Sequence, residues 1–245
     1  MLISSLENLC AHLPGLTNGP ISPAQNPFPN GFWTGLALTA VGVLGLLVAE
    51  KTNWQWARWT FKPLACLGFL LAGWFTAPFG SGYGLCVFVG LVLSVVGDLC
   101  LIPQGSGKVF LGGVAAFLLA HVAYTVAFFF VGISPMGALV AAIPMIAIAL
   151  GVYRWLRPDV PAQLQKPILG YVVVITAMVT LSIGVAVQST DLMLMPVAAT
   201  LFWLSDISVA RDRFKQAGFF NKFWGLPFYF GAQLLFAVTI LMSAA

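Results

Sequence analysis

Two aspartates lie inside long apolar stretches of this sequence, where an ionisable side chain is costly. Asp98 follows Gly97, and Asp206 follows Ser205. An aspartate in the middle of a membrane costs about 2.5–3.5 kcal/mol even on the lenient insertion scale, so each needs a function or a partner. Two carboxylates in one poorly hydrated site can hold different protonation states, one as an acid and one as an anion. The pair therefore predicts general acid–base catalysis; the alternative is an interfacial carboxylate that pairs with Lys62 or with an arginine of a loop.

A histidine is the third catalytic candidate. His121 falls near the middle of another apolar run, and Tyr124 lies three residues later on the same helical face. In a catalytic site, His121 would orient a water molecule or relay a proton. The alternatives are an interhelical hydrogen bond, which is common in membrane bundles, or a metal ligand together with the two aspartates. No HxxxH or HxxE spacing supports the metal.

Further polar side chains are candidates for holding a substrate. Tyr229 and Gln233 are spaced i, i+4 and so share one face near the start of the last apolar run, where a helix N-terminus can attract a phosphate. Interhelical hydrogen bonds explain this pair equally well, and Tyr171 is equally a tyrosine of the membrane interface. The substrate-binding candidates are Lys62, Ser94, Tyr124, Tyr171, Ser205, Tyr229 and Gln233.

The composition requires that helices in a membrane position these residues. The chain has 245 residues, of which 60% are apolar and 7% charged, whereas about 25% of a soluble protein is charged. This excludes a water-soluble enzyme, a disordered protein and a nucleic-acid-binding module. Apolar runs of spanning length predict an all-α, polytopic bundle of eight transmembrane helices. The expected spans are 32–49, 62–78, 83–102, 109–131, 136–153, 167–187, 192–210 and 224–243.

The basic residues test the number of helices and give an orientation. All eleven lysines and arginines fall in or beside alternate connections between the eight spans. By the positive-inside rule, these four basic loops are cytoplasmic and both termini lie outside, which means the inner membrane if the source is bacterial. Residues 1–31 contain five prolines and lack the basic start and apolar core of a signal peptide, so we expect a proline-rich extended tail before a transmembrane domain of residues 32–245.

The chain also contains a weak internal repeat. Lys62-Pro63-Leu64 is matched by Lys166-Pro167-Ile168 after 104 residues, and Gly97-Asp98-Leu99 by Ser205-Asp206-Ile207 after 108 residues. The repeat suggests two four-helix halves in the same orientation, related by an axis along the membrane normal. Packing the halves together would bring both aspartates to one cavity. All the polar candidates except His121 then lie in the cytoplasmic third, which predicts a pocket with a polar mouth and an apolar lower part, suited to a single-chain lipid.

Several motifs, in order, resemble one known family. The run from Phe88 to Ile102 is similar to the Gly-Asp signature of YhhN-type lysoplasmalogenases. The same is true of Phe110…Gly113…Phe117…His121…Tyr124, of 204–210, of Tyr229…Gln233, of Lys62-Pro63-Leu64 and of Tyr171. The resemblance covers about residues 35–243. The chain departs from the family pattern at Phe230, where a second tyrosine is common, and at Arg211-Asp212, where the family commonly has asparagine in Ala-Leu-Asn.

The resemblance implies hydrolysis of the vinyl ether bond of lysoplasmalogens. The products would be a fatty aldehyde and glycerophosphoethanolamine or glycerophosphocholine, and the reaction needs no metal and no organic cofactor. This implied reaction leads to a hypothesis for the mechanism. One of Asp98 and Asp206 protonates the vinyl ether, and the other stabilises the cation and takes the proton of the water. His121 orients this water or relays the proton. Other functions remain open at this point: a proton-coupled transporter or lipid carrier, a metal-dependent lipid hydrolase, and a structural scaffold. The expected partners are the bilayer and the ether lipid, with no nucleic acid; the sequence gives no oligomeric state.

Overall fold

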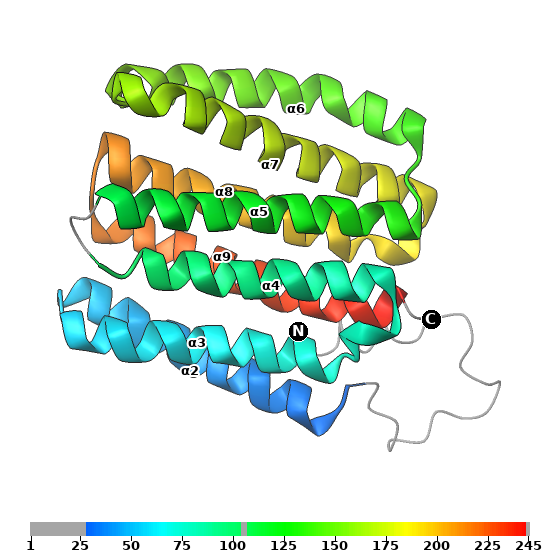
Figure 1. Ribbon diagram of the computed structural model, residues 1–245, viewed down its shortest axis with the longest axis horizontal. Coiled ribbons are helices and arrows are strands. Elements are labelled where there is room, and N and C mark those ends of the chain that lie inside the picture. Colours follow the sequence, from blue (N-terminus) through cyan, green and yellow to red (C-terminus); the bar gives the residue numbers. More distant parts are fainter. Residues whose placement is uncertain (1–27, 104–106, 244–245) are drawn as a thin grey trace.

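The computed structural model describes residues 28–103 and 107–243, and almost all of them are helical (Figure 1). Within these ranges there are eight long helices and no strand, which confirms the predicted all-α bundle. Seven of the eight are long and apolar enough to cross a membrane; the exception is the helix at Gln55–Phe75. The helices are α2 (Asn30–Lys51), α3 (Gln55–Phe75), α4 (Gly82–Cys100), α5 (Gly107–Val131), α6 (Pro135–Leu156), α7 (Ala162–Gln188), α8 (Leu194–Ala210) and α9 (Phe219–Ser243).

The helices run alternately up and down as four antiparallel hairpins, α2–α3, α4–α5, α6–α7 and α8–α9 (Figure 1). All four hairpin turns lie at one end of the bundle, on the left in Figure 1, and the basic residues gather in or beside these turns. The predicted tail falls mostly on residues 1–27, outside the described residues. The two-halves prediction and the cytoplasmic side of the basic loops stay predictions.

Three helices begin five to seven residues earlier than predicted, and a proline lies inside each of them. α3 begins at Gln55 instead of 62, α7 at Ala162 instead of 167, and α9 at Phe219 instead of 224. In α3 the reason is local: Arg58 makes an ion pair with Glu50 at 3.2 Å, and its guanidinium also donates to Gln55 and Asn53. These bonds fix the α2–α3 turn and place Arg58 and Lys62 within a helix.

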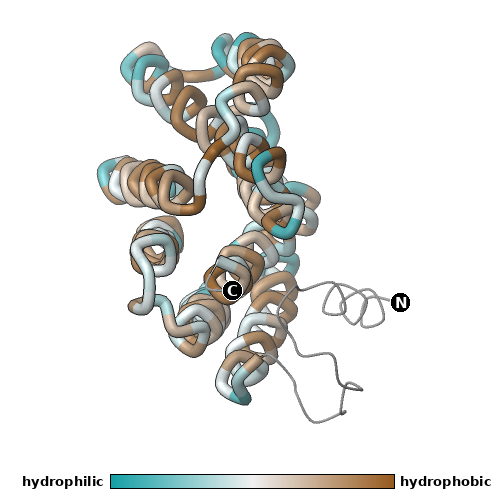
Figure 2. The backbone as a smooth tube through the Cα atoms, turned by 90° about the vertical axis from the view of Figure 1, so that its right-hand side faces the viewer, coloured by the Kyte–Doolittle hydropathy of each residue, from teal (hydrophilic) through white to brown (hydrophobic). Residues whose placement is uncertain are grey.

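Close helix packing surrounds a core of aromatic rings. A Cβ on Gly90 would lie 2.4 Å from the ring of Tyr124, and one on Gly97 would lie 2.7 Å from the ring of Phe117. Glycine at these two positions of α4 therefore allows α5 to bring its rings into the bundle. Elsewhere apolar side chains face outward, as in Leu44 and Ile143, which are 65% and 72% exposed; the end-on view of Figure 2 shows hydrophobic residues on all sides of the helices. Such a surface fits a surrounding bilayer.

Candidate active site

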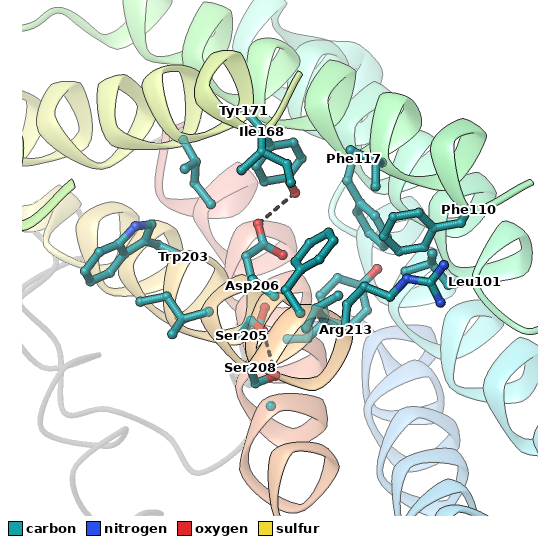
Figure 3. A pocket seen from close by; sticks show the side chains of 18 of the residues that line it. Leu101, Phe110, Phe117, Ile168, Tyr171, Trp203, Ser205, Asp206, Ser208 and Arg213 are labelled. Atoms are coloured by element: carbon teal, nitrogen blue, oxygen red, sulfur yellow. Dashed lines mark hydrogen bonds between the residues drawn. The ribbon is translucent and has the colours of Figure 1, made fainter. Parts of the chain in front are cut away.

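A pocket of about 210 Å³ lies near the end of the bundle that carries the hairpin turns, and every one of the eight helices contributes to its wall (Figure 3). Both aspartates line it, which was the central prediction from the sequence. Most of the other lining side chains are apolar. The predicted residues that also line this pocket are Lys62, Tyr171, Ser205 and Tyr229.

Asp98, at the end of α4, has three donors around its carboxylate. Lys62 Nζ lies 3.0 Å from Oδ1, the Tyr229 hydroxyl donates to Oδ2 at 2.5 Å, and the Cys66 thiol donates to Oδ2 at 3.4 Å. The Asp98 side chain is 4% exposed and that of Lys62 is 12% exposed. A lysine and two further donors compensate the cost of burying a carboxylate at this position. The alternative that an aspartate pairs with Lys62 is therefore observed for Asp98.

Asp206, at the end of α8, has no lysine or arginine within ion-pair distance among the described residues. The Tyr171 hydroxyl donates to its Oδ2 at 2.8 Å (Figure 3), and Nε2 of His121 lies 3.4 Å from the same oxygen. Its side chain is 19% exposed, so it is the more accessible of the two carboxylates. The two aspartates therefore share a pocket but differ in their partners.

The hydrogen bond on the other side of the His121 ring fixes its tautomer. Nδ1 lies 2.6 Å from the carbonyl oxygen of Phe117, and a carbonyl can only accept, so Nδ1 carries a proton. In the neutral ring, Nε2 is then a bare acceptor, and it faces the carboxyl of Asp206. The His121 side chain is fully buried, and Nε2 has no hydrogen bond of its own. Because a bare Nε2 and a carboxylate oxygen can both only accept, a hydrogen bond between them would require a proton on one of the two groups.

Three of the predicted substrate-binding residues lie behind the pocket rather than in its wall. The Tyr124 hydroxyl donates to Gln233 Oε1 at 2.6 Å, and the Tyr124 ring stacks on Phe236 with centroids 4.0 Å apart. Ser94 is fully buried beside Asp98, and its carbonyl accepts a 3.5 Å bond from Tyr229. For Tyr124 and Gln233 the structure shows the interhelical hydrogen bond that was the alternative interpretation.

The pocket also contains two basic side chains in or beside the connection between α8 and α9, which were not predicted individually as site residues. After α8 the chain makes one π-helical turn, Arg211–Lys215, and Arg213 of this turn lines the pocket with its guanidinium 4.5 Å from the Phe110 ring centroid (Figure 3). Among the described residues no carboxylate pairs with Arg213. Lys222 lines the pocket too, and it pairs with Asp212 at 2.8 Å. The cluster of basic residues between α8 and α9 was visible in the sequence, but nothing in the sequence indicated which of these side chains would line the pocket.

The described residues contain no group of three or more histidine, cysteine, aspartate or glutamate side chains placed to hold a metal ion. The combination of His121 with both aspartates, which the metal alternative needs, is thus not assembled as one ligand set. The carboxylates have hydrogen-bond donors as partners instead.

Comparison with known proteins gives a consistent result. The family model described as the YhhN family matches residues 57–240. The chain is 32% identical to the human protein named lysoplasmalogenase TMEM86B over 79% of each chain. It is 31% identical to lysoplasmalogenase TMEM86A of Bos taurus over 76% of this chain and 74% of that protein. It is also similar to an uncharacterized membrane protein YhhN of Escherichia coli O157:H7, with 39% identity over 30% of this chain and 34% of that protein. No solved structure gives a significant match.

Proposed function

Because the chain belongs to the YhhN family, we propose that it is a multi-pass membrane enzyme that hydrolyses the vinyl ether bond of lysoplasmalogens. The names of its TMEM86A and TMEM86B relatives support the reaction at the level of the family. The observation that carries the proposal is that two aspartates with different partners line one pocket. Vinyl ether cleavage needs a proton donor, a water site and a nearby anion, and this pocket supplies groups suited to all three.

The proton donor in this proposal is the pair of Asp206 and His121. A vinyl ether reacts by accepting a proton at its β-carbon, which leaves an oxocarbenium ion at the carbon bonded to oxygen. His121 Nε2 faces Asp206 Oδ2 at 3.4 Å, and in this proposal one proton is held between the two groups and is donated from Asp206, which lines the pocket. After the transfer, Asp206 is an anion beside the new cation. General acid catalysis of this kind contributes roughly 10²–10⁴-fold, and the fixed charge in a poorly hydrated site adds to it.

Water then adds to the cation, and Asp98 receives the proton that this water loses. A water bonded to an oxocarbenium carbon is strongly acidic, so a carboxylate held by Lys62 and Tyr229 is a sufficient base. The resulting hemiacetal collapses: its hydroxyl loses a proton, the carbon–oxygen bond to glycerol breaks, and the glycerol oxygen gains a proton. In total one water is consumed, and one aldehyde and one glycerophosphoethanolamine or glycerophosphocholine are released. The starting state returns when Asp98 gives its proton to solvent and the Asp206–His121 pair takes one up.

In this proposal the phosphate of the headgroup is held by residues other than the predicted substrate-binding ones. Lys62 is engaged by Asp98 and Gln233 lies behind the pocket, so neither is placed to hold a phosphate. Arg213 at the pocket wall is without a carboxylate partner among the described side chains, and a guanidinium is well suited to phosphate oxygens. In this arrangement the phosphate lies near Arg213 and Lys222, and the reacting bond lies deeper, beside Asp206. The basic end of the bundle then faces the cytoplasm and both termini face the opposite side.

A side-by-side incubation tests the activity. Purified protein in vesicles is given a lysoplasmalogen or the ester-linked lysophosphatidylcholine, and fatty aldehyde is measured. We expect aldehyde from the first lipid and no product from the second. Uptake of the lysoplasmalogen without aldehyde would contradict the proposal and identify a carrier. Release of fatty acid from the ester would contradict it as well. Loss of activity on dialysis against a chelator, with recovery on adding metal back, would favour the metal-dependent alternative.

A further inference from the structure

The α6–α7 hairpin is packed tightly at one end only. At the end away from the hairpin turn, a Cβ on Gly137 would lie 2.8 Å from Val187 and one on Gly184 would lie 2.7 Å from Ile133. The backbone N–H of Ser134 also donates to the Gly184 carbonyl at 3.0 Å. These contacts leave no room for anything between the helices at this end.

By contrast, the α2–α3 hairpin is tightly packed along its length. A Cβ on Gly35 would lie 2.5 Å from the Ala72 nitrogen, one on Gly42 would lie 2.5 Å from the Ala65 nitrogen, and one on Gly45 would meet the Phe61 ring at 2.3 Å. In the described part of α6 and α7, glycine contacts this close are confined to the end at Gly137 and Gly184. Nearer the hairpin turn, a Cβ on Gly151 or Gly170 would meet nothing within 4 Å, so close glycine packing does not fill the space between the helices there.

A cavity of about 390 Å³ lies between the two helices, with walls that run from Ala142 to Tyr153 on α6 and from Leu169 to Leu181 on α7. We call it the α6–α7 groove. The threonines in its wall do not offer free hydroxyls, because Thr176 donates to the Val172 carbonyl at 2.6 Å and Thr180 donates to the Thr176 carbonyl at 2.8 Å. Apart from these threonines and Tyr153, the wall consists of alanine, valine, leucine and isoleucine side chains, so the groove suits a hydrocarbon chain.

The groove adjoins the catalytic pocket at one residue of α7. Val172 lines both cavities, and the preceding residue, Tyr171, donates its hydroxyl to Asp206. A chain attached to a group held at Asp206 therefore reaches the groove as soon as it passes Val172. From Val172 to Leu181, near the closed end, α7 rises nine residues, about 14 Å at 1.5 Å per residue.

We propose that the α6–α7 groove binds the alkenyl chain of the substrate and that its closed end limits the length of chain that can be accommodated. This rests on the proposed hydrolysis of lysoplasmalogens and adds a specificity determinant to it. Because α6 and α7 are antiparallel, Ala149 lies near the pocket and Ala142 near the closed end. A bulky side chain at Ala142 obstructs only long chains, whereas one at Ala149 obstructs shorter chains too.

The test compares Ala142→Trp and Ala149→Trp, each assayed for aldehyde release with short-chain and long-chain lysoplasmalogens. A pocket that must reject or accept added methylenes discriminates by roughly tenfold or more, so we expect the long-to-short ratio of kcat/KM to fall about tenfold in both variants, and the cut-off to lie at a shorter chain in Ala149→Trp. The matched control is Ile143→Trp, on α6 but 72% exposed and outside the groove wall, which should keep the parental ratio.

A second measurement does not depend on the tryptophan variants folding. A non-hydrolysable alkyl ether lysolipid with a diazirine at the chain end should label peptides of α6 and α7, and unlabelled lysolipid should compete. Unchanged chain-length ratios in the folded variants, or labelling that unlabelled lysolipid does not reduce, would show that the groove holds bulk lipid and overturn the proposal. If the parent protein releases no aldehyde at any chain length while the label still competes at α6–α7, the proposed hydrolysis fails and the groove stands.

Discussion

His121 and Tyr229 contact the two aspartates in a crossed arrangement. Tyr229 lies 108 residues after His121, the same interval that separates Asp206 from Asp98. His121, on α5 at the end of the first four helices, faces Asp206 of the second four. Tyr229, on α9 at the end of the second four, donates to Asp98 of the first. Each carboxylate thus has one partner from the opposite set of four helices in addition to partners from its own set. The two partners from the opposite set differ, so the two aspartates have different surroundings.

The first prediction concerns the Nε2 atom of His121. In His121→Asn the shorter amide can still donate to the Phe117 carbonyl, but nothing faces Asp206. The shared proton is lost, so we expect kcat to fall about 10²-fold with little change in KM. Steady-state rates of aldehyde release measure this. A parental kcat in folded His121→Asn would remove His121 from proton transfer.

The second prediction concerns the hydroxyl of Tyr229. Tyr229→Phe keeps the ring packed against Phe69 and Phe117 but removes the 2.5 Å bond to Asp98. A bond to a charged group is worth about 1.5–3 kcal/mol, so we expect roughly a tenfold or larger fall in kcat. Tyr83→Phe is the matched control, since it removes a buried hydroxyl bond to Thr239 at a distance from the pocket. Equal rates in the two variants would contradict a role for Tyr229 in the reaction.

The third prediction is a stability test of the Lys62–Asp98 ion pair. Lys62→Met leaves the buried Asp98 anion without its lysine, which costs about 3–5 kcal/mol in comparable buried pairs. In the double variant with Asp98→Asn no charge is stranded, so most of that loss should be recovered, while activity stays low. Thermal unfolding of the four proteins in the cycle measures the coupling. Additive losses would mean that the two side chains do not interact energetically.

The fourth prediction tests Arg213 as the phosphate ligand. Arg213→Gln should raise KM for lysoplasmalogen by roughly tenfold, the effect of one lost charge-assisted hydrogen bond, and leave kcat nearly unchanged. Arg154→Gln, which removes an arginine that is not part of the pocket wall, is the control. A parental KM in Arg213→Gln would place the headgroup elsewhere.

The sequence was sufficient to predict the membrane bundle and its eight helices, because long apolar runs and alternating basic loops follow directly from the cost of polar groups in lipid. It was also sufficient to single out Asp98 and Asp206, since a carboxylate in an apolar run is costly unless it has a partner or a function. Their partners depend on which helices become neighbours: Lys62 is 36 residues and Tyr229 131 residues from Asp98, and periodicity along one helix carries no information on such contacts.

The lack of information on contacts between helices also explains which predictions from the sequence were wrong. Helices were predicted to begin at 62 and 167, next to or at a proline, but contacts across turns, such as that between Arg58 and Glu50, let α3 begin seven residues earlier, at Gln55. Gln233 shares a face with Tyr229, as predicted from the i, i+4 spacing, yet Gln233 meets Tyr124 inside the bundle while Tyr229 reaches Asp98. Arg213 was one basic residue among several, and only the π-helical turn after α8 brings it to the pocket.

The most direct test of the account is the initial rate of aldehyde release from lysoplasmalogen by purified Asp206→Asn and Asp98→Asn, each shown to be folded by thermal unfolding and size exclusion. Asparagine keeps the shape of each side chain but cannot donate or receive the proton that moves in the reaction. We predict that both rates fall about 10²–10⁴-fold below that of the parent protein. Near-parental turnover by either folded variant would contradict the two-aspartate mechanism.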